Sequence, residues 1–161
     1  MTYKASLDKT AMIITMAISI GFAVIIGGQF ILIKDGDLAI PIYTIIACLL
    51  IYFLAFAFRP INYTVTRDEI IVRRPLLNVH LKRIDIKSVA LIEKNKIKGS
   101  IRTFGVAGLF GYYGNFANFS IGRMTWYATR KDNPVLIETM NNKKFIFTPN
   151  DPVQFVNELS S

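Results

Sequence analysis

Few side chains in this sequence could perform catalysis. His80 is the only histidine and Cys48 the only cysteine. A structural metal site needs several His, Cys or carboxylate ligands, and a general base must lie within hydrogen-bond reach of the proton that it removes. No cysteine or paired acid accompanies His80 nearby in the sequence, so we expect it to be a partly exposed strand residue. We therefore expect no catalytic residue, no metal and no cofactor; a membrane-bound enzyme would need a pocket that unites His80 with an acid or a nucleophile.

The segment from Gly99 to Gly122 is the most unusual part of the chain. It holds six of the ten glycines and six aromatic residues. A phosphate-binding loop would end in Gly-Lys-Ser/Thr or form a G-x-G-x-x-G turn between a strand and a helix, and neither pattern is present. We expect a long irregular loop that contacts a partner or the membrane interface, or that packs on its own domain. The candidate contact residues are Phe104, Phe110, Tyr112, Tyr113 and Phe116.

Basic residues form three clusters in the second part of the chain. Residues 59–161 contain 16 Lys and Arg against 8 Asp and Glu, so the whole net charge of +8 resides there. Each Lys or Arg near an anionic leaflet contributes on the order of 1 kcal/mol of attraction; the alternative is a solvated basic face of the kind that flanks membrane helices. We expect no nucleic-acid partner, because the apolar segments described next bring a lipid surface nearer. The candidate lipid contacts are Arg73, Arg74, Lys82, Arg83, Lys94, Lys96, Lys98 and Arg102.

Two uncharged segments precede the basic region. Residues 11–33 and 38–58 carry no charged side chain, and about 20 apolar residues in a helix cross the hydrocarbon core of a bilayer. A cleaved signal peptide would have a shorter apolar core. We predict transmembrane helices over 11–33 and 38–58, joined by an extracytoplasmic turn at 34–37 and preceded by a cytoplasmic tail at 1–10.

The charges beside these segments predict their orientation. Lys4 and Lys9 precede the first helix and Arg59 follows the second, whereas the connection carries one Lys and two Asp. By the positive-inside rule both termini are cytoplasmic. Small residues four apart, such as Ala17 and Gly21, predict close helix contacts, either within the chain or between copies of it.

Residues 59–161 have the pattern of a small β domain. Short β-branched runs indicate strands, the dipeptide Asn141-Asn142 indicates a hairpin turn, and the run from 124 to 129 alternates as a strand with Trp126 on one face. The predicted strands are 62–66, 70–74, 76–83, 87–93, 124–129, 135–139 and 143–148.

The chain ends in a pattern typical of an amphipathic helix. Asp151 is a favourable N-cap, and Pro152 suits the first helical position. Apolar residues then recur at helical spacing, so this helix can cover one face or one end of the sheet. The apolar stripe consists of Pro152, Phe155, Val156 and Leu159.

Two apolar helices, a β domain and a closing helix resemble the small bacterial membrane proteins with a pleckstrin-homology (PH) domain. The resemblance rests on Ile70-Ile71-Val72-Arg73-Arg74-Pro75, Ile86-Lys87-Ser88-Val89, Arg102-Thr103-Phe104-Gly105 through Gly111-Tyr112-Tyr113-Gly114, and Thr148-Pro149-Asn150-Asp151-Pro152. It implies a PH-like barrel of about seven antiparallel strands capped by a C-terminal α-helix, located at the bacterial cytoplasmic membrane and without catalytic activity. Phosphoinositide-binding PH domains carry Lys and Arg in the loop between the first two strands. That loop is Arg67-Asp68-Glu69 here, so the resemblance does not extend to inositol phosphates.

Two hypotheses of function follow. The first is a non-catalytic scaffold in which two membrane helices present a cytoplasmic PH-like domain to a protein partner or to further copies of the chain. The second is recognition of anionic lipid head groups by the basic clusters, with insertion of Phe110, Tyr112 and Tyr113 into the membrane.

Overall fold

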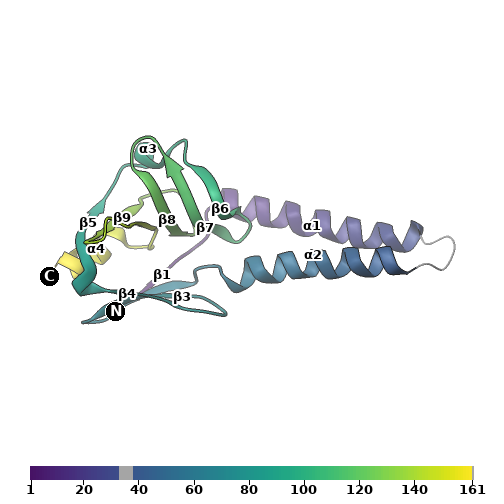
Figure 1. The fold of residues 1–161 in the computed structure, drawn as a ribbon, viewed down its shortest axis with the longest axis horizontal. Helices are drawn as coiled ribbons and strands as arrows, with labels where there is room; N and C mark the ends of the chain where they lie inside the picture. Colours follow the sequence, from purple (N-terminus) through teal and green to yellow (C-terminus); the bar gives the residue numbers. More distant parts are fainter. Residues whose placement is uncertain (33–37, 161) are drawn as a thin grey trace.

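The computed structural model describes residues 1–32 and 38–160 and combines a helical hairpin with a β domain (Figure 1). Helices α1 (Lys9–Leu32) and α2 (Ala39–Ala57) lie side by side and extend away from the domain. Both are long and apolar enough to cross a membrane, as judged by length and composition. Their bounds agree with the predicted segments to within two residues, and the predicted turn at 34–37 lies outside the described residues.

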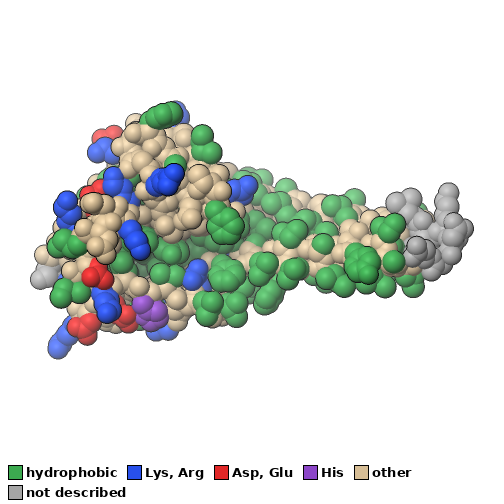
Figure 2. All heavy atoms as spheres, viewed as in Figure 1, with side chains coloured by type: hydrophobic (Ala, Val, Ile, Leu, Met, Phe, Trp, Pro, Cys, Tyr) green, Lys and Arg blue, Asp and Glu red, His purple; other side chains and the backbone are tan. Residues whose placement is uncertain are grey.

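Figure 2 shows how the two parts differ in surface chemistry. Hydrophobic side chains cover the hairpin, whereas Lys and Arg gather over the β domain. Local sequence explains where the helices begin and end: the Asp8 carboxylate accepts a hydrogen bond from the Ala11 amide at 2.6 Å, which caps α1. Helix α2 ends just before Arg59-Pro60, because proline cannot continue a helix.

The β domain contains two sheets in the part of the chain that the structure describes. The four-stranded sheet has the order β1 (Thr2–Lys4), β2 (Asn62–Val65), β3 (Glu69–Arg73), β4 (Val79–Lys82). The six-stranded sheet has the order β5 (Ile86–Leu91), β9 (Val135–Thr139), β10 (Lys144–Phe147), β8 (Gly122–Ala128), β7 (Gly111–Asn118), β6 (Ile101–Gly108). The other elements of the domain are the 3-10 turn η1 (Arg83–Asp85), α3 (Lys94–Ile97) and α4 (Pro152–Ser160).

All seven predicted strands exist, but the prediction of about seven antiparallel strands is wrong in two respects. Among the described residues there are ten strands, the additional ones being β1, β6 and β7, and β10 pairs with β8 in parallel. The parallel pair arises because β10 folds back along β9 in a tight hairpin and so takes the position between β9 and β8. Asn142 has φ = 57° in that hairpin, as the Asn-Asn dipeptide predicts.

The residues expected to form a tail also belong to the domain. Strand β1 pairs antiparallel with β2, with Tyr3 opposite Tyr63, and both rings are buried. The four-stranded sheet therefore uses residues from both sides of the helical hairpin.

The prediction of a long irregular loop at 99–122 is also wrong, because the segment contains strands β6 and β7. Strands β6 and β7 form a twisted ribbon that pairs from end to end, with Gly105 opposite Gly114. These two glycines have φ values of +114° and +113°, in the region open to glycine alone. They allow the two backbones to approach closely, and they also remove the alternation of side chains by which a strand is recognised in a sequence.

The domain core lies between the two sheets and under α4. Phe155 of α4 is fully buried and meets the Tyr3 ring edge-on at 5.2 Å. The Asp151 carboxylate accepts a hydrogen bond from the Gln154 amide at 3.0 Å, which confirms the predicted cap. The predicted alternation along β8 is confirmed, and the face that includes Trp126 is the buried one.

Candidate binding site between the sheet and the hairpin

The β6–β7 ribbon docks on the helical hairpin. The Phe110 ring, at the tip of the ribbon, packs edge-on against the rings of Tyr52 at 5.1 Å and Phe56 at 5.6 Å in α2. The Phe110 amide donates a hydrogen bond to the Thr15 hydroxyl in α1 at 2.9 Å. The domain is thus attached to both helices through packing and hydrogen bonds.

Two tyrosines of β7 strengthen this attachment. The Tyr113 hydroxyl donates to the carbonyl oxygen of Ala55 in α2. The Tyr112 hydroxyl donates to the Asp8 carboxylate at 3.3 Å, and burial, together with the Asp8 charge, raises the pKa of Tyr112 to about 12. The same carboxylate caps α1, so the start of α1 is fixed to the sheet.

Phe110, Tyr112 and Tyr113 are not free side chains that could insert into a membrane on their own, contrary to the prediction. These side chains are only 8%, 1% and 5% exposed because they pack on the hairpin or in the core. Phe116 is buried against Trp126. Of the five candidate contact residues, only Phe104 is exposed, at 76%.

A groove of about 810 Å³ lies where the ribbon meets the hairpin. We call it the junction groove. Its lining is mostly apolar and comes from both helices and from strands β6, β7 and β8, with Arg74 and Arg102 as its two cations. The apolar side chains from the helices and the residue that follows α2 are Ile18, Ile51, Leu54, Ala55 and Phe58.

Arg74 is held in place at this groove. Its guanidinium lies over the rings of Phe58, at 5.4 Å, and Tyr127, at 5.8 Å, and its Nε donates to the carbonyl oxygen of Leu77. Partial burial lowers the pKa of the Arg74 guanidinium. A positive charge that has lost part of its hydration gains more from an anion than a solvated one does.

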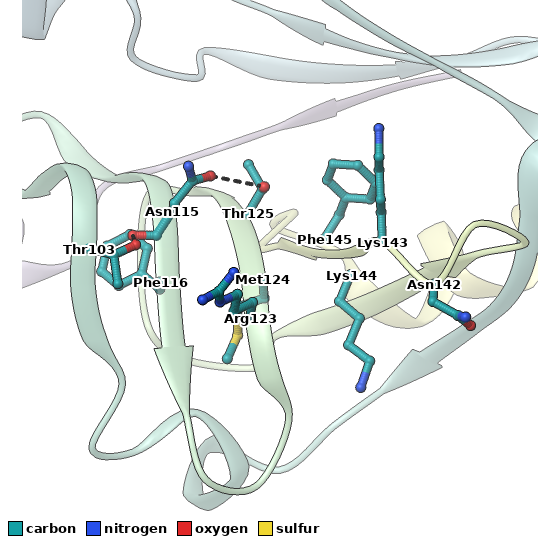
Figure 3. Close-up of a pocket in the computed structure, with 10 residues that line it drawn as sticks. All are labelled: Thr103, Asn115, Phe116, Arg123, Met124, Thr125, Asn142, Lys143, Lys144 and Phe145. Carbon is teal, nitrogen blue, oxygen red and sulfur yellow. Dashed lines mark hydrogen bonds between the residues drawn. The ribbon is translucent and has the colours of Figure 1, made fainter.

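A second recess, of about 600 Å³, adjoins the junction groove and shares Asn115 and Thr125 with it. Figure 3 shows these two side chains pointing to one another, and the Thr125 hydroxyl donates to the Asn115 side-chain oxygen at 3.2 Å. Lys143 and Lys144 are neighbours in the sequence but point to opposite sides (Figure 3). The recess is also lined by Arg123 of β8. Sequence reasoning missed these three cations because they stand apart from the basic clusters.

The structure does not gather the predicted basic clusters on one surface. The Arg83 guanidinium donates to the carbonyl oxygen of Glu158 at 3.1 Å, which stabilises the C-terminal end of α4. Lys94 pairs with Asp132 at 2.7 Å. The remaining members divide into Arg74 and Arg102 in the groove, and the exposed side chains Arg73, Lys82, Lys96 and Lys98.

His80 is an exposed residue of strand β4 and lines neither of the two cavities described above. Its Nδ1 is 3.0 Å from the Glu69 carboxylate on the neighbouring strand β3, and its side chain is 54% exposed. An acid partner does exist, but on the surface of the four-stranded sheet, and neither the junction groove nor the adjoining recess includes His80. Among the described residues no group of three or more His, Cys, Asp or Glu could hold a metal ion.

Comparison with known proteins assigns the family. No curated protein and no solved structure matched the chain. The family model described as "Bacterial PH domain" matches residues 61–161, which is more than half of the chain and includes every strand except β1. The chain therefore belongs to the bacterial PH domain family.

Proposed function

We propose that this protein is a membrane-anchored, non-catalytic binding module that holds an anionic phospholipid in the junction groove. The observation that carries the proposal is the position of Arg74, a partly desolvated cation at the edge of an apolar groove that two candidate membrane helices help to form. Its family is not known as catalytic.

The length of α2 sets the depth of this groove in a bilayer. Its 19 residues rise about 28 Å, close to the roughly 30 Å of a hydrocarbon core. The whole helix is therefore needed to cross. Ile51 and Leu54, in its last two turns, then lie within the inner leaflet, and the part of the ribbon that meets them lies there too.

At that depth the groove matches the chemistry of a phospholipid. An acyl chain would pack on Ile18, Ile51 and Leu54, and a phosphate would accept hydrogen bonds from Arg74 and Arg102. Guanidinium groups form a planar fork that suits phosphate oxygens. The exposed ring of Phe104 would extend the apolar contact.

Replacing Arg74 by glutamine tests this site. We expect the dissociation constant for phosphatidylglycerol to rise about tenfold in the variant, because the variant loses a charge-assisted hydrogen bond to the phosphate. The measurement is native mass spectrometry of the full chain in a non-ionic detergent, titrated with phosphatidylglycerol or with phosphatidylcholine. Glycerophosphoglycerol, the head group without chains, should not compete, since the apolar half of the groove would stay empty.

Arg73→Gln is the matched control. Arg73 precedes Arg74 in the sequence but is exposed and does not line the groove, so this variant should bind as the wild type does. Equal losses in both variants, or equal retention of the two lipids by the wild type, would refute the site.

A second candidate function is binding of a protein partner or of another copy of the chain along β6. This strand is one of the two edges of the six-stranded sheet, β5 being the other, and it exposes Ile101 at 70% and Phe104 at 76%; such an edge can add a further strand. A benzoylphenylalanine at position 104 should crosslink a discrete species in native membranes, whereas one at the exposed Lys87 on β5 should not. The same yield at both positions would contradict this second function.

A further inference from the structure

The turn between β3 and β4, residues 75–78, is fastened to the end of helix α2. The Leu76 amide donates a hydrogen bond to the carbonyl oxygen of Ala57 at 3.1 Å, and Ala57 is the last residue of α2. Just before β2, the Ile61 amide donates to the carbonyl oxygen of Arg73 at 2.8 Å. The β3–β4 turn therefore lies beside the end of the helical hairpin, and Figure 1 shows this end of β3 and β4 directed to the same side as the helices.

The β3–β4 turn exposes two consecutive leucines. Leu76 is 54% exposed and Leu77 58%, and Ile61, which is bonded to the same strand, is 42% exposed. Hydrophobic side chains also lie at this end of the domain next to the hairpin (Figure 2). A single exposed apolar residue needs no explanation, whereas a group of them marks a contact with a partner or a membrane.

The turn is held in one conformation by its own side chains. The Asn78 side-chain oxygen accepts a hydrogen bond from the Arg74 amide at 3.1 Å, and the Arg74 Nε donates to the carbonyl oxygen of Leu77. An ordered backbone thus presents the two leucines, so little backbone entropy remains to be lost when they are covered.

We propose that the β3–β4 turn docks the domain on the bilayer, with Leu76 and Leu77 among the lipid chains at their boundary with the head groups. Because the whole of α2 is needed to cross, Ala57 lies at this boundary, and its hydrogen bond to Leu76 places the turn at the same depth. There the leucines continue the apolar surface of the hairpin, which favours lipid over a protein as the contact. The exposed Arg73 beside them reaches a phosphate while its apolar stem stays near the chains.

This inference rests on one part of the proposed function, that α2 crosses a membrane. It does not rest on the junction groove, which neither Leu76 nor Leu77 lines. Phosphatidylcholine bilayers without anionic lipid therefore suit the test, because an apolar contact of the turn persists in them whether or not the groove selects an anionic phospholipid.

The depth of a fluorescent label tests the contact. In a Cys48→Ala background, Leu77→Cys is labelled with bimane and the full chain is reconstituted in phosphatidylcholine bilayers. A nitroxide near the head-group end of the lipid chains should quench this label at least about threefold more than a label at Ile84→Cys, because interfacial apolar groups reach about 5–10 Å into the boundary. Iodide in the water should quench the two labels in the opposite order.

Ile84 is the matched control and Leu49 the reference for crossing. Ile84 is 83% exposed and follows β4 at the far end of the four-stranded sheet, where Lys82 pairs with Glu69. Leu49 lies near the middle of α2 and is 57% exposed, so a nitroxide placed deep in the lipid chains should quench a label at Leu49→Cys.

Each result bears on the proposal. Quenching at Leu49→Cys together with equal quenching at Leu77→Cys and Ile84→Cys overturns the docking turn while leaving α2 in the membrane. Shielding of the Leu77→Cys label from both quenchers also overturns it, because a protein then covers the turn. Absence of quenching at Leu49→Cys overturns the crossing of α2 and this proposal with it. Loss of the junction groove in the Arg74→Gln test is a separate result, since the labelled variants keep Arg74.

Discussion

Replacement of Gly114 by alanine is expected to lower the free energy of unfolding of the domain by roughly 2–6 kcal/mol. A left-handed φ that only glycine adopts readily costs about 1–3 kcal/mol in another residue, and overpacking adds about 1–3 kcal/mol. A Cβ at Gly114 would lie 2.7 Å from the Gly105 Cα and closer still to the carbonyl oxygen of Phe104. These are backbone atoms of β6, which cannot rotate away, so the two strands must separate.

Denaturant unfolding in detergent, followed by the fluorescence of Trp126, measures this loss. Trp126 lies opposite Gly114 in the neighbouring strand and so reports directly on the ribbon. Gly122→Ala is the control, because Gly122 has φ = +87° but no atom within 4 Å of the place that a Cβ would take; this variant bears the cost of the backbone conformation alone. If the two variants lose the same stability, close packing of the ribbon is not what requires glycine.

Phe155→Ala should destabilise the domain by about 3–5 kcal/mol, the usual cost of removing a buried aromatic side chain. The Phe155 ring is fully buried, and its centre lies 5.2 Å from that of Tyr3, 6.0 Å from that of Tyr63 and 6.1 Å from that of Phe147. Its loss leaves a cavity under α4 and frees both the closing helix and strand β1.

Circular dichroism during urea unfolding is the measurement, with Val153→Ala as the matched change. Val153 lies on the same helix but is 57% exposed, so its truncation should cost no more than about 0.5 kcal/mol. Comparable midpoints for the two variants would show that α4 does not close the core.

The sequence was informative wherever one physical pattern dominated. Uninterrupted apolar runs predicted both long helices, and β-branched runs with polar turns predicted seven strands. The Asp151 cap and the apolar stripe that includes Phe155 predicted α4 and its buried face. In each case the local pattern and the tertiary packing favour the same structure.

The sequence was misleading where distant contacts decide the structure. Three residues at 2–4 are too few to show an alternation, and they become a strand only because β2 lies beside them. The ribbon was mistaken for a loop because its glycines serve a cross-strand approach that no local pattern reveals. The alternation over 124–129 was predicted correctly, but which of its two faces is buried depends on what surrounds the strand in space.

Arg74 and Arg73 illustrate the same limit at the candidate site. The two are adjacent in the sequence and equal in charge, and both belonged to one predicted cluster. The structure separates them, since Arg74 lies over two rings beside the groove whereas Arg73 is exposed. Composition predicts an attraction to anions; the packing of rings decides which cation can take part in a specific site.

Pairing of β1 with β2 constrains the order in which the chain can fold during synthesis. The helical hairpin is in effect an insertion between two neighbouring strands of one sheet. During synthesis Tyr3 emerges first, yet the strand that covers it follows both helices, and Phe155 follows almost the whole chain. The domain can therefore close only after both helices have been made, and the strand pairing then locks both flanks of the hairpin on the same side of any bilayer that it crosses.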